Sequence, residues 1–396
     1  MNELFDGKIL CSANPTDCYW LDVLYEAAGI EPTFGVRPLE TFIGREPATK
    51  ALALRPAFRD HRALGDVRAL EACVSHYLQE GSRSMKSEEI KKNNHYVWAH
   101  YLRGWAENGR DVYRKTKKGV ELYSVRGVAC EPHFYRITPL DDQDVEFIQV
   151  WLDKADEHLR AFHYKMLEKM IYLSCAIEVL DREDQAHKRE LLLANTLENI
   201  HTTVENDFRP ILDSLRKGDL SVLKSAQNRN NLHSYIGHQF ARTKFLRDTF
   251  IDSWSHAGDE YVRIAKKTWW FMSLVYGVNV SFNLDRFYYR KNVVWLVNKT
   301  KTPFLTSDHP VISVHPSVVD TSSGPPPDHS DFYFPISPTV AYMVNDSEMY
   351  GRGVMEATEE CVELLNRNML LRCGQTVFGS TAAVVQNTKR PKQKTA

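Results

Sequence analysis

Two histidine–tyrosine pairs, His95-Tyr96 and His100-Tyr101, lie five residues apart and are followed by Arg103. An imidazole titrates near neutral pH, so a histidine beside tyrosine hydroxyls and a guanidinium can act as a general acid or base. The alternative is a histidine that caps or packs at the start of a helix. Because His95 and His100 are not spaced as an i, i+4 pair, they do not share one helix face, and we do not expect a metal site there.

A second polar group lies at helical spacing. His238 and Arg242 are four residues apart, so an imidazole and a guanidinium project from one face of an expected helix. Arginine is the side chain best suited to bidentate recognition of phosphate or carboxylate. Equally, Arg242 could be buried and paired with Glu198 or Glu205, whose seven-residue spacing places both carboxylates on one helix face.

A carboxylate and an imidazole are adjacent at Asp308-His309, between two expected strands. Strand ends are where rigid scaffolds often present catalytic groups. An aspartate at such a position also often accepts hydrogen bonds from backbone amides and shapes the turn. Both interpretations remain open for Asp308.

Aromatic and basic residues alternate around the first histidines. Aromatic rings can stack on nucleobases and cations can neutralise phosphates, so this stretch could form a local nucleic-acid patch. Equally, the rings are core residues and the charges cover a solvated hairpin. The residues concerned are Tyr96, Trp98, Tyr101, Trp105, Arg103, Arg110, Arg114, Lys115, Lys117 and Lys118.

The composition is that of an ordinary globular protein. The 396 residues are 43% hydrophobic and 26% charged, and 50 basic against 51 acidic residues leave a formal charge of -1. A global attraction to nucleic acid or to an anionic membrane is therefore not expected. No stretch is apolar enough to span a bilayer and the start lacks a secretory signal, so we expect a cytoplasmic protein without a membrane partner.

Several familiar kinds of site are missing. The sequence holds no P-loop, no Gly-x-Gly-x-x-Gly after a strand, no Gly-x-Ser-x-Gly and no His-Glu-x-x-His. The seven cysteines are widely spread and include no Cys-x-x-Cys pair, so we expect free thiols and not a zinc site or a disulfide framework.

The expected fold is α+β: mainly helical, with an N-terminal hairpin and a C-terminal antiparallel sheet. Residues 1–90 form a helical N-terminal extension, 91–385 the main domain and 386–396 a basic tail. Helices are expected over 17–26 and 66–78, within 141–217, and over 232–254, 261–276 and 356–371. A hairpin is expected over 111–125 and strand-like runs over 287–297, 311–314 and 333–344, while 321–330 is a loop.

Five motifs in this order resemble the DUF4238 family. They are Asn94-His95-Tyr96 with Tyr101-Leu102-Arg103-Gly104-Trp105, then Glu131-Pro132-His133-Phe134-Tyr135, then residues 239–243, then Pro303-Phe304-Leu305-Thr306-Ser307-Asp308-His309-Pro310, and Phe334-Pro335-Ile336-Ser337-Pro338. The resemblance covers residues 91–345 and leaves out the first ninety. The family is largely without an assigned activity, so the resemblance indicates the extent of the main domain but does not indicate which reaction, if any, the chain catalyses.

The resemblance implies that the recurrent polar residues of the family fall here on His95, Glu205, Gln239, Arg242 and Asp308. The chain departs from the pattern at Val97-Trp98, where relatives commonly carry a hydrophobic residue and proline. His238 is not a recurrent feature of the family, which argues against a role for it.

Two functions follow from these residues. In the first, the chain hydrolyses a phosphodiester, with RNA as the favoured substrate. His95 is then the general acid or base and Arg242 holds the phosphate, while Glu205 and Asp308 orient the imidazole or complete an acid–base pair. Substrate contacts are assigned to Tyr96, Tyr101, Arg103 and Gln239.

In the second function, the chain is a noncatalytic binding or regulatory module. The same polar residues then form a buried network that joins the helical region to the sheet. No cofactor or metal site follows from the sequence, although Glu205 and Asp308 could hold Mg²⁺ through water molecules.

Overall fold

The computed structural model describes residues 9–12, 35–38, 89–116, 118–289, 292–316 and 331–387. The chain divides into two compact units, Met1–Lys86 and Ser87–Ala396. In the first unit, β1 (Ile9–Ser12) and β2 (Gly35–Pro38) form a parallel pair, which the sequence did not lead us to expect. The helices expected over 17–26 and 66–78, the loop 321–330 and residues 388–396 of the tail lie outside the described residues.

The second unit begins with short strands around one hairpin. β4 (Asp111–Thr116) and β5 (Gly119–Ser124) pair in antiparallel register, which confirms the expected hairpin. Before and after it, β3 (Asn93–His95) and β6 (Cys130–Pro132) form a separate two-stranded ribbon. Between β3 and β4 lie the helix α6 (Ala99–Leu102) and the 3₁₀ turn η1 (Arg103–Trp105).

Long helices follow, as expected from the periodicity. They are α7 (Asp142–Asp153), α8 (Glu157–Arg182), α9 (Ala186–Arg216), α10 (Ala226–Ala241), α11 (Lys244–Asp252) and α12 (Asp259–Tyr289). The single helix expected over 232–254 was wrong, because α10 ends at Ala241 and α11 starts anew at Lys244. Thr243 has an extended backbone, and its hydroxyl oxygen accepts a hydrogen bond from the Leu246 amide as the N-cap of α11.

The remaining chain builds the main sheet and supplies two strands of a second sheet. Its strands are β7 (Val293–Asn298), β8 (Thr306–Ser307), β9 (Ile312–Ser313), β10 (Phe332–Ser337), β11 (Val340–Val344), β12 (Gly353–Ala357) and β13 (Val377–Gly379), with α13 (Glu359–Arg372) and α14 (Ala382–Asn387). The five-stranded sheet has the order β12-β7-β11-β10-β9, and β5-β4-β13-β8 form a second sheet. Residues 287–289, expected as strand, end α12, and β12 runs parallel to β7, so the main sheet is mixed.

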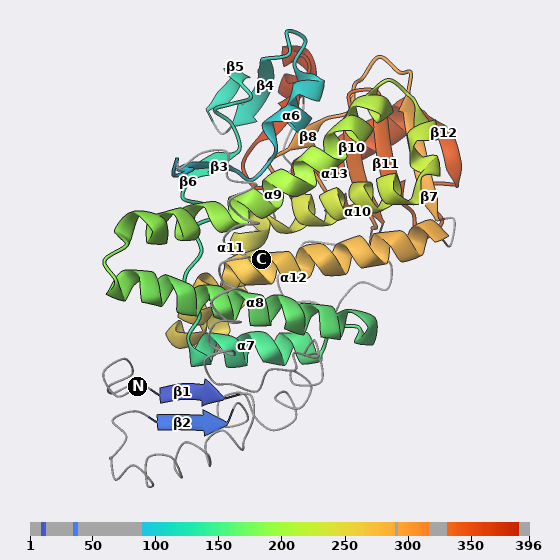
Figure 1. Cartoon of the computed structure of the whole chain (residues 1–396). Coiled ribbons are helices and arrows are strands. Elements are labelled where there is room, and N and C mark those ends of the chain that lie inside the picture. The colour runs from blue at the N-terminus through green and yellow to red at the C-terminus, as the bar shows by residue number, and fades with distance from the viewer. Residues whose placement is uncertain are drawn as a thin grey trace, which may run out of the picture. The chain divides into compact units, whose positions relative to one another are not determined.

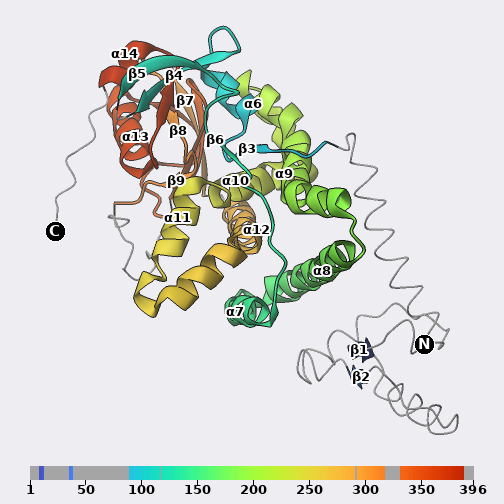
Figure 2. The same ribbon diagram turned by 90° about the vertical axis from the view of Figure 1, so that its left-hand side faces the viewer.

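The inner strands of the main sheet are buried on both faces, and their successive side chains point alternately into two cores. On β7, Trp295 packs in a core with α9 and α10, whereas Val294 and Leu296 pack in a core with α13. Tyr342 and Met343 of β11 divide between the two cores in the same way. Figures 1 and 2 show α13 on one side of the sheet and α10, then α12, on the other.

The second unit is therefore α+β and mainly helical, as predicted. Within the described part of the chain, none of the helices combines the length and the apolar character that crossing a lipid bilayer requires.

Candidate functional site

The β3–β6 ribbon is attached to α9 by the side chain of Asn94. Its amide nitrogen donates to Glu198 Oε2 (3.1 Å), and its amide oxygen accepts from the Tyr135 backbone N–H (3.2 Å). The Tyr135 hydroxyl in turn donates to the His95 carbonyl (3.0 Å). Asn94 is 1% exposed, so this junction is sealed and fixes the residue that precedes His95.

His95 is half-buried at the edge of this junction. Its Nε2 lies 3.1 Å from the carbonyl oxygen of Arg126, and a carbonyl can only accept, so Nε2 carries the proton. Burial lowers the pKa of His95, although the Arg126 bond and Glu198 oppose the shift. The neutral ring therefore keeps Nδ1 as an acceptor, which is the form that a general base requires.

Arg242 and Glu205 form a buried ion pair between α10 and α9. Arg242 Nη1 lies 2.7 Å from Glu205 Oε1, and Nη2 donates to Gln239 Oε1 (2.9 Å). Gln239 then donates from Nε2 to the Tyr96 carbonyl (2.9 Å). The side chains of Arg242 and Glu205 are 2% and 15% exposed, so protein groups and not solvent surround this network.

Burial raises the pKa of Glu205, and the Arg242 guanidinium opposes that shift. Burial would lower the pKa of Arg242, but the Glu205 carboxylate outweighs it and the net pKa is raised. The guanidinium therefore stays charged and holds its partner as a carboxylate. The sequence left Glu198 and Glu205 open as partners of a buried Arg242, and the structure pairs Arg242 with Glu205.

Two histidines that the site prediction did not include lie beside this ion pair. The rings of His201 and His238 are 5.7 Å apart, and the His201 ring is 4.5 Å from that of Tyr135. Both His201 ring nitrogens and Nδ1 of His238 are buried without a hydrogen-bond partner. Burial lowers the pKa of His238 to about 4 and that of His201 well below its ordinary value. The available signal was the i, i+4 spacing of His201 to Glu205 and of His238 to Arg242.

Asp308 holds the turn that follows α13. Its carboxylate accepts from three successive backbone amides, those of Gly374 (2.8 Å), Gln375 (2.7 Å) and Thr376 (3.0 Å). Asp308 is 7% exposed. These are the contacts of the second interpretation, in which the aspartate shapes a turn. The adjacent His309 is also inside, where Nδ1 meets the Thr243 hydroxyl at 2.8 Å.

The four residues assigned to the substrate occupy different environments. Tyr101 is fully buried, and its hydroxyl donates to the Pro335 carbonyl (2.8 Å) beside the Thr306 hydroxyl (2.7 Å). Tyr96 is half-buried against the ring of Phe134 (5.2 Å between centroids). Arg103 is half-buried in η1, and Gln239 is 0% exposed.

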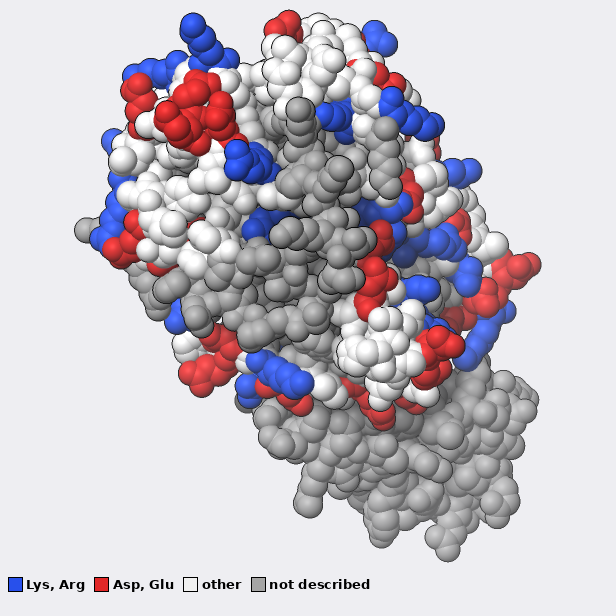
Figure 3. Space-filling view, turned by 180° about the vertical axis from the view of Figure 1, so that it is seen from behind, with Lys and Arg blue, Asp and Glu red and all other residues white. Residues whose placement is uncertain are grey.

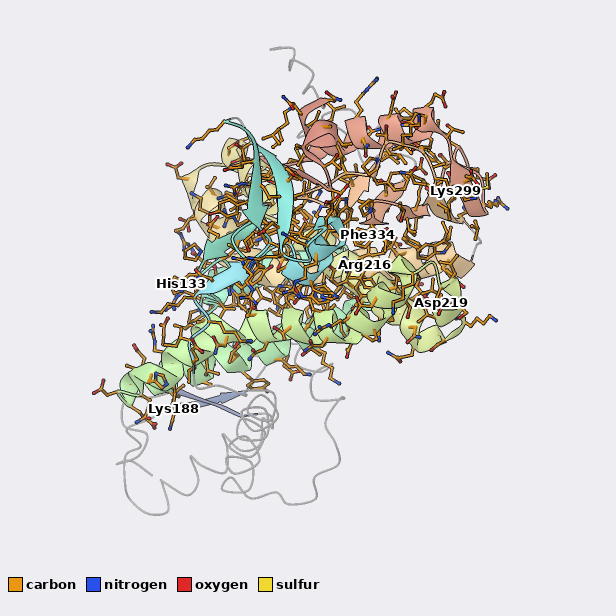
Figure 4. The ribbon with its side chains drawn as sticks, turned by 90° about the horizontal axis from the view of Figure 1, so that it is seen from above. His133, Lys188, Arg216, Asp219, Lys299 and Phe334 are labelled. Atoms are coloured by element: carbon orange, nitrogen blue, oxygen red, sulfur yellow. The ribbon has the colours of Figure 1, made fainter. Side chains whose placement is uncertain are left out.

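A second arginine explains why Tyr101 is so firmly held. Arg216 of α9 donates to the carbonyls of Tyr101 (2.5 Å) and His100 (3.3 Å), and more weakly to Ile336 in β10 (3.5 Å). A Cβ at Gly104 would lie 2.7 Å from this guanidinium, so a larger residue there would push the Arg216 side chain aside. In Figure 4 the labels of Arg216 and Phe334 mark where α9 meets β10.

The outer hairpin carries exposed charge. Arg110 is 80% exposed, and the Arg114 guanidinium stacks 3.8 Å above the Tyr123 ring while pairing with Glu121 at 2.8 Å. A shallow hollow of about 390 Å³ lies between this hairpin and α14, lined by Tyr113 and Lys115 among others. The network around Arg242 contributes no residue to it. On the face shown in Figure 3, acidic and basic side chains are interspersed.

No metal centre accompanies these groups in the described ranges, where no three His, Cys, Asp or Glu side chains are gathered closely enough to hold an ion. The model of DUF4238, a family of proteins of unknown function, matches residues 93–269 and 280–383. The match includes both ribbon strands, α9, α10 and the turn at Asp308. Searches of curated proteins and of solved structures gave no match to this chain.

Proposed function

The chain belongs to the DUF4238 family of unknown function, and on that premise we propose that it is a noncatalytic binding module in which the polar residues around Arg242 are structural. The observation that carries the proposal is the sealed Arg242 network. The guanidinium is committed to Glu205 and Gln239 at 2% exposure, so it has little access to a phosphate. Asp308 is likewise committed to three backbone amides.

The surface best suited to a partner is the β4–β5 hairpin, and the favoured partner is RNA. Arg110, Lys118 and Arg126 are exposed on it, and Tyr123 is 40% exposed beside them. Tyr101 and Trp105 are core residues and are not available to stack on bases. Binding would therefore rest on phosphate contacts with one aromatic platform, which gives little sequence preference. RNA binding would then depend on this local group of cations, because the chain as a whole is nearly neutral.

Salt-dependent binding tests this function. We expect the full chain to bind fluorescent single-stranded RNA in anisotropy titrations, with affinity falling as salt rises. The Arg110→Gln/Lys118→Gln double variant should lower the slope of log K against log salt by about 1.4, if each cation neutralises one phosphate. Lys165→Gln/Lys169→Gln, which removes two exposed cations from α8, is the matched control. Equal slopes for all three proteins, or no binding, would overturn the proposal, and single-stranded DNA shows whether the 2′-hydroxyl matters.

A second candidate function is a phosphodiester hydrolase acting on RNA, and the geometry of His95 favours it. The Arg126 carbonyl fixes the ring so that Nδ1 is the acceptor, and Glu198 and Arg242 both act on its pKa. In this function His95 is the general base, and Glu198 joins Glu205 as a nearby carboxylate. The buried position of Arg242 argues against its role as a direct phosphate ligand.

Cleavage of total RNA, with and without Mg²⁺, separates the two candidates. A hydrolase should cleave RNA, and His95→Ala should lower the rate by about a hundredfold or more, as the loss of a general base does. His100→Ala is the matched control, because His100 is instead held by Asp213 (Nε2 to Oδ1, 2.9 Å). No cleavage by the wild-type chain, or equal cleavage by all three proteins, would rule the hydrolase out and leave the binding module standing.

A further inference from the structure

Among the described residues the main sheet has two edge strands, β9 and β12, and β12 is the more exposed. Within the described residues β12 pairs only with β7, and no described strand pairs with the backbone N–H and C=O groups on its other side. In Figure 1, β12 lies at the right-hand border of the sheet. Val354 is 61% exposed and Met355 is 39% exposed, whereas Ile312 in β9, at the opposite edge, is 1% exposed.

β12 carries one protective charge, Glu356, but otherwise lacks the usual protection of an edge strand. Natural sheets block their edges with lysine, proline or a bulge, because an open edge is a template for another strand. The sequence from Gly353 to Ala357 holds neither lysine nor proline, and its register with β7 is continuous. The exposed Val354 and Met355 occupy positions where a lysine or proline would hinder pairing with another strand. The edge is therefore suited to pair with a strand from another molecule.

The charged residues at the two ends of this strand could pair with the same residues in a second copy of the chain. Arg352 and Glu356 are four residues apart, with Val354 midway between them. If two copies of β12 pair antiparallel about a twofold axis at Val354, each Arg352 lies opposite Glu356 of the second copy. Arg352 directly precedes β12, and the twofold symmetry makes the two ion pairs equivalent, so both form together.

We propose that β12 is a self-association surface, at which two copies of this chain join their main sheets edge to edge through antiparallel β12 strands. The central contacts are Val354 with Val354 of the second copy and Gly353 with Met355 of the second copy. Within a single chain, Arg352 pairs with Glu348, and Glu356 pairs with Lys299 at 2.7 Å. Figure 4 labels Lys299 on this outer side of the sheet. Such exposed pairs are weak and exchange readily for the intermolecular ones.

Sedimentation velocity of the full chain over a range of concentrations tests the proposal. We expect a monomer–dimer equilibrium with a dissociation constant in the micromolar range, as small interfaces show. Arg352→Glu and Glu356→Arg should each raise the dissociation constant about tenfold or more, because each places like charges opposite one another twice. The Arg352→Glu/Glu356→Arg double variant should restore dimerisation, since the pairs form again with the signs exchanged.

Controls separate this edge from other apolar surfaces. Val354→Lys should abolish the dimer by setting two ammonium groups against each other at the axis. Val179→Lys replaces an equally apolar valine on α8, 48% exposed, and should leave the dimer intact. Circular dichroism should show the same fold for every variant, because all of these side chains are exposed. A monomeric wild-type chain, or a dimer that the single charge reversals leave unchanged, would overturn the proposal, and failure of the double variant would overturn the Val354 register.

Discussion

Replacing Arg242 should lower the free energy of unfolding strongly. In Arg242→Met the Glu205 carboxylate stays buried without its cation, and Gln239 loses a hydrogen bond. Removing one partner of a buried pair typically costs about 3–5 kcal/mol of unfolding free energy. The Arg242→Met/Glu205→Leu double variant should recover most of this loss, because the uncompensated charge is gone. Urea unfolding measures both values.

A surface pair provides the control for this cycle. Arg263 and Glu260 also form an ion pair, but their side chains are 46% and 58% exposed, so Arg263→Met should hardly change the unfolding midpoint. If Arg242→Met were equally mild, Arg242 would not be a structural group, and its availability to a ligand would have to be reconsidered.

The sequence predicted the environment of some polar residues better than that of others. Helical spacing placed Glu198 and Glu205 on one helix face and offered either as a partner of Arg242, and Arg242 pairs with Glu205. Asp308 was ambiguous because a turn-forming and a catalytic aspartate look the same until their acceptor atoms are seen. His201 was missed, since a histidine on the inner face of an amphipathic helix differs little from its apolar neighbours in pattern. Its contact with His238 depends on how α9 and α10 pack, which the sequence pattern does not contain.

Among the elements, those with strong local signals were predicted best. The β4–β5 hairpin combined alternation with a glycine at the turn. α13 was expected from residue 356 but starts at Glu359, because residues 356 and 357 belong to β12 and Thr358 caps the helix. The break between α10 and α11 was missed, because apolar residues continue through it at helical spacing. Only the cap at Thr243 marks it. The parallel position of β12 beside β7 depends on a long-range crossover, which no local pattern contains.

At the scale of the whole molecule, we expect the free energy of unfolding to fall as the pH falls. Burial lowers the pKa of His233 to about 4 and that of His309 to about 3, from the ordinary value of 6.5. Both are neutral in the folded chain and take up a proton readily only when unfolded. Their contribution is thus fully present above about pH 6.5 and is lost as the pH falls towards the folded-state values, by about 1.4 kcal/mol per pH unit for each histidine.

Unfolding in urea at intervals between pH 7 and pH 5 checks this sign and slope. His309→Asn replaces the ring that meets Thr243 with an amide of similar reach, so the variant should fold and show a shallower loss of stability with acid, by about one proton. His256→Asn, at an exposed position, should keep the wild-type slope. Carboxylates with lowered pKa, such as Glu131 and Glu190, lose their contribution only at lower pH, so they do not account for a loss in this window. A wild-type stability that stays level from pH 7 to pH 5 would mean that the interior histidines reach water, and the sealed network at the α9–α10 contact would then be open to a ligand after all.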